Sequence, residues 1–239
     1  MIYYKEVIDM SLVQCPYEEQ YDFIYIDDDY TNNILKLSGY NDINDNDYRY
    51  LCGCGILAVF LSEYALESAS NAYNYAQYML GSAFPLGEPI IATNAEFSYS
   101  YAEDILKGRF ELGENVISTN AFYSCQYAEY VLKDCFELGE ATISTNAYYS
   151  YQYALYIRKG RFELGEPIIA TNAGYSYRYA TEVITGRFEL GEPIIATDAK
   201  LSYLYAKNVL EGRFELGENA ISSDNSYKLN YEKLIGIRL

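Results

Sequence analysis

The chain has 239 residues, half of them apolar, so it is long enough for one or two folded domains and too apolar for a disordered chain. Its 34 acids against 17 bases give a net charge of −17, which disfavours nucleic acid as a direct ligand because phosphate binding needs a basic stripe. A basic protein partner, or solubility alone, accounts better for this charge. Because the chain has no histidine, Ser–His and Cys–His nucleophiles are excluded.

Residues 1–47 are expected to form an acidic N-terminal cap that does not follow the pattern of the rest. The first 50 residues hold 11 acids and 3 bases. Residues 23–26 (FIYI) are a candidate short strand and residues 30–37 a candidate short helix. Residues 1–10 carry acids and no long apolar run, unlike a signal peptide. The apolar run at 51–61 is too short to cross a bilayer, so no membrane association is expected.

No cofactor or metal site is expected. Residues 42–47 resemble the opening of a calcium loop, but Asp47 stands where glycine is required and Gly53 where the bidentate glutamate belongs. The pair Cys52 and Cys54 has neither CxxC spacing nor a histidine to complete a zinc site. Five cysteines without a secretory leader favour a reduced, intracellular compartment; they are Cys15, Cys52, Cys54, Cys125 and Cys135.

The rest of the chain is organised by the heptapeptide GRFELGE. Four exact copies and two imperfect ones place phenylalanines exactly one period of 26 residues apart, at Phe84, Phe110, Phe136, Phe162, Phe188 and Phe214. A fixed period of this length indicates a stacked array in which each unit buries its apolar face against its neighbours. We divide the array, residues 48–239, into a degenerate unit at 48–67, six units over 68–223 and a truncated C-terminal unit at 224–239.

Each unit is predicted to be a pair of antiparallel helices. In unit 94–119, Asn94 is a helix N-cap and Gly108 ends a longer helix over about 95–107. A shorter helix of two turns begins near the next Gly-Glu pair, with its Ile pair packed inward, and Phe and Leu of the heptapeptide fill the junction. The predicted fold is an all-α, right-handed superhelical solenoid of about seven αα-hairpins, capped at both ends.

Comparison of the copies assigns the faces of the longer helix. The variable positions, those equivalent to 96, 100, 103, 104 and 107, share one side at helical spacing and are expected to face solvent. Positions 95, 97, 98, 99, 101, 102, 105 and 106 stay apolar, aromatic or small and are expected to form a buried arc. Position 101 is always tyrosine, so we expect core packing there rather than a base-stacking platform. The glutamate at position 114 recurs in all six copies. It is interpreted as a structural acid at the start of the shorter helix, with pairing to the arginine of the heptapeptide as an addition and a cation-binding row of carboxylates as the alternative.

Aromatic residues on the variable side are the candidate protein-binding residues, because exposed aromatics are enriched at interfaces. The alternative is that they are scattered surface tyrosines in a chain with 30 of them. The candidates are Tyr78, Phe122, Tyr130, Tyr148 and Tyr156.

The repeat, with its Tyr-x-Tyr-Ala, Gly-Arg-Phe, Gly-Glu and Ile-Ala elements at fixed places, resembles tandem helical repeats in largely uncharacterised proteins of giant DNA viruses and bacteriophages. The resemblance covers about residues 68–239 and implies no catalytic residues, and it places the protein in the cytoplasm of an infected host cell. We expect a non-enzymatic protein-interaction scaffold with one unidentified protein partner and leave its oligomeric state open. The alternative is an acidic decoy that mimics nucleic acid and occupies a host DNA- or RNA-binding or defence protein. An enzyme with its active site in residues 1–50 is a third, less favoured class.

Overall fold

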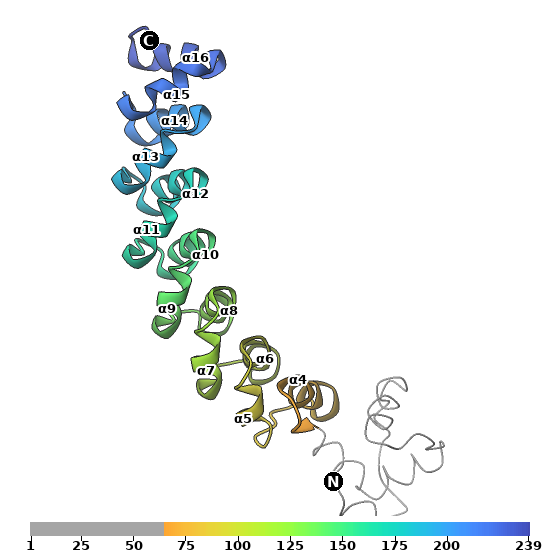
Figure 1. The fold of residues 1–239 in the computed structure, drawn as a ribbon. Coiled ribbons are helices and arrows are strands. Elements are labelled where there is room, and N and C mark those ends of the chain that lie inside the picture. The colour runs from red at the N-terminus through yellow and green to blue at the C-terminus, as the bar shows by residue number, and fades with distance from the viewer. Residues whose placement is uncertain (1–64) are drawn as a thin grey trace, which may run out of the picture. The chain divides into compact units, whose positions relative to one another are not determined.

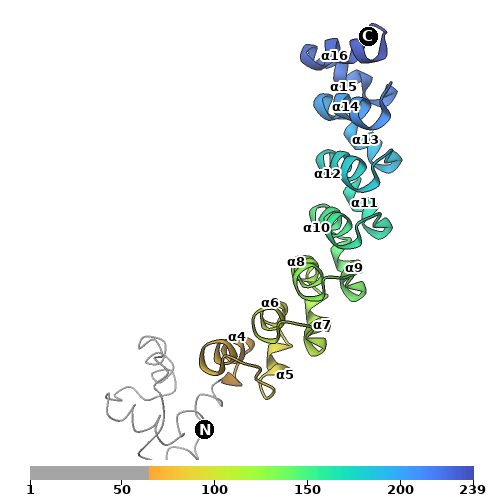
Figure 2. The ribbon, with the colours of Figure 1, turned by 180° about the vertical axis from the view of Figure 1, so that it is seen from behind.

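The computed structural model describes residues 65–239, and the chain divides into two compact units with the boundary after Ile91. Each unit is described by itself. Over the described range the regular secondary structure is helical, without a strand, and helix pairs recur at the 26-residue period (Figures 1 and 2). The predicted all-α class with repeated helix pairs is therefore confirmed.

Several sequence-based expectations lie outside the described residues. These are the acidic cap at 1–47 with its candidate strand and helix, most of the degenerate unit at 48–67, and the rejected motifs at 42–47 and at Cys52 and Cys54.

The described part of the first unit holds one helix pair. Helix α4 (Ala69–Asn74) continues directly as a π-helical segment, Tyr75–Leu80, and is followed by the short helix α5 (Glu88–Ile91). The ring of Phe84, between the two helices, lies 4.9 Å from the ring of Tyr75, centroid to centroid.

The second unit repeats the same pair five times and adds one final helix. The longer helices start as α-helices α6 (Ala95–Ser100), α8 (Ala121–Gln126), α10 (Ala147–Gln152), α12 (Ala173–Arg178) and α14 (Ala199–Tyr205). They continue as π-helical segments over Tyr101–Leu106, Tyr127–Leu132, Tyr153–Arg158, Tyr179–Ile184 and Ala206–Leu210. The shorter helices are α7 (Glu111–Ile117), α9 (Glu137–Ile143), α11 (Glu166–Ile169), α13 (Glu192–Ile195) and α15 (Glu218–Ser223). Short 3₁₀ turns at Glu163–Gly165, Glu189–Gly191 and Glu215–Gly217 precede the last three of these. The final helix is α16 (Asn225–Ile235).

The N-terminus of every longer helix is capped as predicted. The side-chain oxygen of the cap residue accepts a hydrogen bond from a backbone N–H of the first turn, as Asn120 does from Phe122 at 2.9 Å and from Tyr123 at 3.2 Å. Each such cap contributes about 1 kcal/mol. The cap residues are Ser68, Asn94, Asn120, Asn146, Asn172, Asp198 and Asp224.

The C-terminus of the longer helix differs from the prediction, because the glycine of the heptapeptide is not the left-handed residue. That conformation belongs to the residue before it, Lys107 with φ of 52° in unit 94–119. The carbonyl of Ala102 then accepts from the N–H groups of both Lys107 and Gly108. The longer helix thus closes with a π-helical turn and ends one residue earlier than predicted. The left-handed residue at this position of each repeat is Gly81, Lys107, Lys133, Lys159, Thr185 or Glu211.

The shorter helix packs closely on the longer one through a glycine. A Cβ atom on Gly165 would lie 2.5 Å from Cδ1 of Phe162 and 2.7 Å from Cβ of Ser150, so only glycine fits between these side chains. Ser150 is fully buried, and its hydroxyl donates to the carbonyl of Ile143 at the end of the preceding shorter helix, 3.0 Å away. The same contact recurs at Ser124, Ser176 and Ser202.

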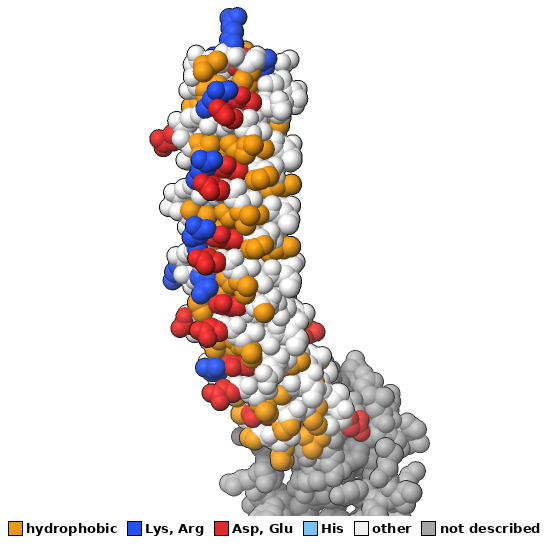
Figure 3. All heavy atoms as spheres, turned by 60° about the vertical axis from the view of Figure 1, so that its left-hand side comes forward, with side chains coloured by type: hydrophobic (Ala, Val, Ile, Leu, Met, Phe, Trp, Pro, Cys, Tyr) orange, Lys and Arg blue, Asp and Glu red, His pale blue; other side chains and the backbone are white. Residues whose placement is uncertain are grey.

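The apolar residues around the shorter helix are less uniformly buried than predicted. Of each Ile pair only the second member is fully buried, such as Ile169, whereas Ile168 is partly exposed. The Leu of the heptapeptide does not fill the junction, because Leu164 is 55% exposed. Figure 3 shows hydrophobic side chains on this surface beside charged ones.

The face assignment of the longer helix is largely confirmed. In unit 94–119, positions 96, 104 and 107 are exposed and 100 and 103 are half-buried. Ser98, Tyr101 and Ala102 are fully buried, while the other positions of the predicted buried arc are half-buried. The fully buried arc of this longer helix is therefore narrower than predicted.

Within the second compact unit, the tyrosines of the column equivalent to position 101 link each repeat to the preceding one by their hydroxyl groups. Tyr179 accepts a hydrogen bond from the N–H of Phe162 at 2.8 Å and donates to Glu166 at 3.0 Å. Its ring meanwhile packs on the phenylalanine of its own unit, Phe188, 5.0 Å away. Burial raises the pKa of this hydroxyl, so it stays protonated and keeps its role as donor. Equivalent bonds are made by Tyr127, Tyr153, Tyr205 and Tyr231.

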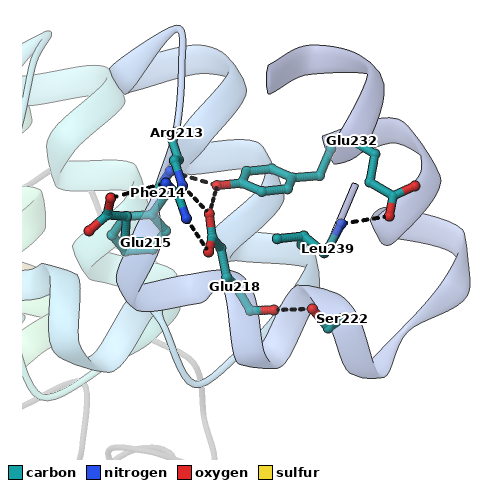
Figure 4. Close-up of polar contacts among 8 residues, drawn as sticks. Arg213, Phe214, Glu215, Glu218, Ser222, Glu232 and Leu239 are labelled. Atoms are coloured by element: carbon teal, nitrogen blue, oxygen red, sulfur yellow. Dashed lines mark hydrogen bonds and ion pairs between the residues drawn. The ribbon is translucent and has the colours of Figure 1, made fainter. Parts of the chain in front are cut away.

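The recurring glutamate is the acceptor of this network. Glu166 is 7% exposed, and both its oxygens accept bonds at 2.8 Å from the guanidinium of Arg161. Figure 4 shows the equivalent fork between Arg213 and Glu218. The structural interpretation of this glutamate column, and its pairing with arginine, are confirmed.

Two places depart from the repeating pattern, one at Cys135 and one in α16. Cys135 stands in place of the arginine in its copy, and there Arg158 of the next unit reaches Glu140 at 3.7 Å. In α16, Lys228 and Glu232 occupy positions that are small in earlier units (serine and alanine), and Glu232 accepts a hydrogen bond from the backbone N–H of Leu239 (Figure 4). Larger, charged side chains therefore replace small residues that are buried in the preceding repeat, Ser202 and Ala206.

Candidate protein-interaction surface

All five predicted binding residues are exposed at the surface. In the second unit, Phe122 is 39% exposed, Tyr130 49%, Tyr148 42% and Tyr156 53%. Tyr78 is 62% exposed and belongs to the first unit. The local fold explains their exposure, because Phe122 and Tyr148 stand in the first turn of the longer helix and Tyr130 and Tyr156 in its π-helical half.

Phe122 and Tyr148 are part of a larger set of aromatic side chains in mutual contact. Seven rings lie on α6, α8, α10 and α12, with neighbouring centroids 4.9 to 6.0 Å apart. Edge-on and tilted contacts at these separations are favourable beyond the area they bury. We call this set the aromatic ribbon; in order of contact it consists of Tyr99, Tyr123, Phe122, Tyr149, Tyr148, Tyr175 and Tyr151.

The sequence-based prediction does not include these seven rings as one connected set. Tyr123, Tyr149 and Tyr175 stand at the position equivalent to 97, which is predicted to be buried, whereas each is only half-buried. The sequence carries a signal for it, the aromatic pairs Phe122-Tyr123 and Tyr148-Tyr149 one period apart. Gly174 and Lys200 replace the first member of the pair in the next two repeats, so the ribbon ends at α12 and does not continue onto α14.

Hydrogen bonds between neighbouring repeats stabilise the side of this surface. The hydroxyl of Tyr151 donates to a carboxylate oxygen of Glu182, and the amide nitrogen of Asn208 donates to the hydroxyl of Tyr177 at 2.8 Å. Burial, with Glu182 as a further cause, raises the pKa of Tyr151. Tyr130 is open to solvent, and its pKa is raised by the adjacent carboxylate of Glu129. Both hydroxyls are therefore neutral at physiological pH and serve as donors or acceptors.

The net charge of the variable positions is negative in the first repeat of the second compact unit and positive in its last full repeat. Unit 94–119 contributes three acids and one base there: Glu96, Glu103, Asp104 and Lys107. Unit 198–223 contributes two bases and one acid: Lys200, Lys207 and Glu211. The aromatic ribbon thus lies between an acidic end and a basic end, an arrangement able to orient a ligand as well as hold it.

The described residues include no group of three or more histidine, cysteine, aspartate or glutamate side chains placed to hold a metal ion. No helix within residues 65–239 has the length and apolar character needed to cross a membrane. Cys125 is buried and its pKa is raised to about 12 by that burial, so it is a poor nucleophile. Comparison of the chain with protein-family models, curated proteins and solved structures finds no match.

Proposed function

We propose that the chain is a non-enzymatic protein-interaction scaffold, a right-handed superhelical solenoid whose aromatic ribbon binds one segment of a partner protein. The observation that carries the proposal is the continuity of the ribbon across four successive longer helices. Rigid aromatic rings bind at a small cost in side-chain entropy and dominate interface energies. Two rings of the ribbon, Phe122 and Tyr148, stand at a position that differs between copies, which fits recognition of one particular sequence. From the resemblance to viral repeat proteins we propose a host-cell protein as the source of that segment.

The charges of the variable positions specify the partner further. A segment that runs along the ribbon meets acids near Glu96 and bases near Lys200. We expect a partner segment with lysine or arginine at one end, apolar or aromatic residues in the middle and acids at the other end. Because the two ends differ in sign, only one direction of binding satisfies both.

The alternative of an acidic decoy is less favoured by the distribution of charge. Residues 65–239 carry 22 acids and 14 bases, so much of the net charge of −17 belongs to residues 1–64. The most regular carboxylates, such as Glu166 and Glu192, are buried and engaged by tyrosine and arginine, and therefore cannot imitate a row of phosphates.

A peptide-display selection on the full chain tests the scaffold function. We expect the selected peptides to share the basic–apolar–acidic order. They should bind the Phe122→Ala/Tyr148→Ala/Tyr175→Ala variant, which removes three rings of the aromatic ribbon, at least tenfold more weakly, with weak salt dependence. The matched control is Leu229→Ala, which removes another exposed apolar side chain from α16 and is expected to leave binding unchanged. Equal affinity for the triple variant and the wild type contradicts the proposal, and a steep fall of binding with salt favours the decoy instead.

A further inference from the structure

The leucine of each heptapeptide forms a second exposed apolar feature, separate from the aromatic ribbon. These leucines are unbroken in all copies of the repeat and are half or more exposed, so the fully buried core does not explain their recurrence. We call those of the second unit the leucine row: Leu112 (53% exposed), Leu138 (52%), Leu164 (55%), Leu190 (53%) and Leu216 (58%).

Four of the five leucines are flanked by charges of both signs from the heptapeptide, and Leu138 by the glutamate alone. In the last full copy, Glu215 directly precedes Leu216, and Arg213 lies 3.3 Å from Glu215 with half of its side chain exposed. Arginine takes this place in four of the five copies, and Cys135 in the other. Figure 3 shows Lys and Arg beside Asp and Glu following one another in line along the array, with hydrophobic side chains next to them.

The leucine row has the same residue in every repeat, whereas the residues of the aromatic ribbon differ from one repeat to the next. A partner that contacts the whole row must therefore have a repeating surface of its own. A ligand that contacts every leucine must present matching groups at the same spacing as the stacked helix pairs. A second copy of this chain does so by construction. Because four of the five positions offer an apolar centre with both arginine and glutamate beside it, the surface is also largely self-complementary, as an interface between identical subunits requires.

The number of exposed residues is sufficient for a stable dimer. Each repeat shows the Glu-Leu pair, the heptapeptide arginine or its replacement, and the residue after the buried glutamate, such as Pro167. Five repeats supply about twenty residues, within the range of roughly 20–30 per partner in a standard interface. Apolar centres with charged rims are also the usual layout of such interfaces.

We propose that the leucine row is a homodimer interface, on which a second copy of this chain packs its own leucine row in register. The proposal concerns surface residues that the proposed scaffold function does not use. A monomeric protein can still be a scaffold, and a dimer can exist without the partner segment.

Sedimentation equilibrium of the full chain, over a roughly hundredfold range of concentration, tests the proposal. The expected result is the mass of two chains for the wild type and of one chain for Leu138→Glu/Leu164→Glu/Leu190→Glu. The control is Tyr130→Ala/Tyr148→Ala/Tyr156→Ala, which is expected to remain a dimer. A wild type with the mass of one chain throughout, or a leucine variant that remains a dimer, overturns the proposal.

A cysteine cross-link supplies a second test that does not depend on the folding of the triple variant. When all five leucines pair in register, the central one lies opposite its own copy in either orientation of the second chain. We therefore expect Leu164→Cys to form a covalent dimer under mild oxidation in excess over the wild type, which controls for the native thiols. Leu112→Cys then reports orientation, cross-linking only if the chains run parallel. Failure of Leu164→Cys to exceed the wild type overturns the in-register interface.

Discussion

Replacing Tyr179 by phenylalanine removes the hydroxyl but keeps the ring. The variant therefore measures the hydrogen bonds that join two neighbouring repeats separately from the packing of the ring. The N–H of Phe162 loses its acceptor and stays buried without a partner, which costs about 1–3 kcal/mol. Glu166 loses one bond worth about 1 kcal/mol but keeps both bonds to Arg161. The half-exposed arginine is screened by solvent and does not compensate. We expect the free energy of unfolding to fall by about 2–4 kcal/mol.

Urea denaturation followed by circular dichroism measures this loss, and hydrogen exchange at the Phe162 amide localises it. The matched control is Tyr175→Phe, which removes a hydroxyl from a partly exposed ring of the aromatic ribbon and is expected to change stability by less than about 0.5 kcal/mol. In a double-mutant cycle, Tyr179→Phe and Glu166→Gln are expected to couple, because they share one bond. If Tyr179→Phe is as neutral as its control and the Phe162 amide keeps its protection, the hydroxyl does not join the units.

Three further outcomes follow from the local geometry. Gly165→Ala places a methyl group against Phe162 and is expected to lower the free energy of unfolding by about 1–3 kcal/mol. Gly160→Ala in the same heptapeptide, whose Cβ would make only an ordinary contact of 3.9 Å with the carbonyl oxygen of Arg158, should be close to neutral. Urea denaturation compares the two variants, and equal effects contradict the close packing. Lys159→Gly relieves a left-handed lysine with φ of 51° and should stabilise the protein by up to about 1 kcal/mol, seen as a higher melting temperature, while a lower one means that the lysine side chain contributes more than the backbone loses. Burial raises the pKa of Tyr231 to about 12, so its hydroxyl is protonated in the folded chain and ionises near pH 10 in the unfolded one; its contribution to stability is complete below about pH 10 and lost as pH rises towards 12. Tyrosinate absorbance should then rise together with the loss of helix, and ionisation of all tyrosines near pH 10 without unfolding would exclude this mechanism.

The sequence alone predicts the features of this fold that repeat with a simple chemical reason. Asn94 and its equivalents cap helices because a short side-chain oxygen reaches a free N–H, and that requirement is local. Tyr179 and Glu166 recur because each completes a contact in every copy, so a comparison of copies identifies them as structural. The exposure of Tyr130 follows from helical spacing.

Features that depend on backbone details are the ones the sequence does not predict. A π-helical turn has the same composition as an α-helical one, and its end shifts the left-handed residue from Gly108 to Lys107. The exposure of Leu164 depends on which side of Gly165 carries the close contact, and periodicity does not decide that. The aromatic ribbon needs ring positions from neighbouring units, which no single repeat contains.

The hydroxyl link between units also determines how the protein can change in length. From Tyr127 to Tyr231, the N–H that donates to each tyrosine lies 17 residues before it and the carboxylate that accepts from it lies 13 residues before it, so each junction is complete within two adjacent repeats. Removal of residues 146–171 joins Thr145 to Asn172, the same dipeptide as Thr171-Asn172, and leaves every remaining tyrosine at its correct distance. A deletion one residue longer or shorter displaces a buried tyrosine from its partners. Duplication or loss of whole units is therefore tolerated, and the number of units can vary while the chemistry of each junction stays the same.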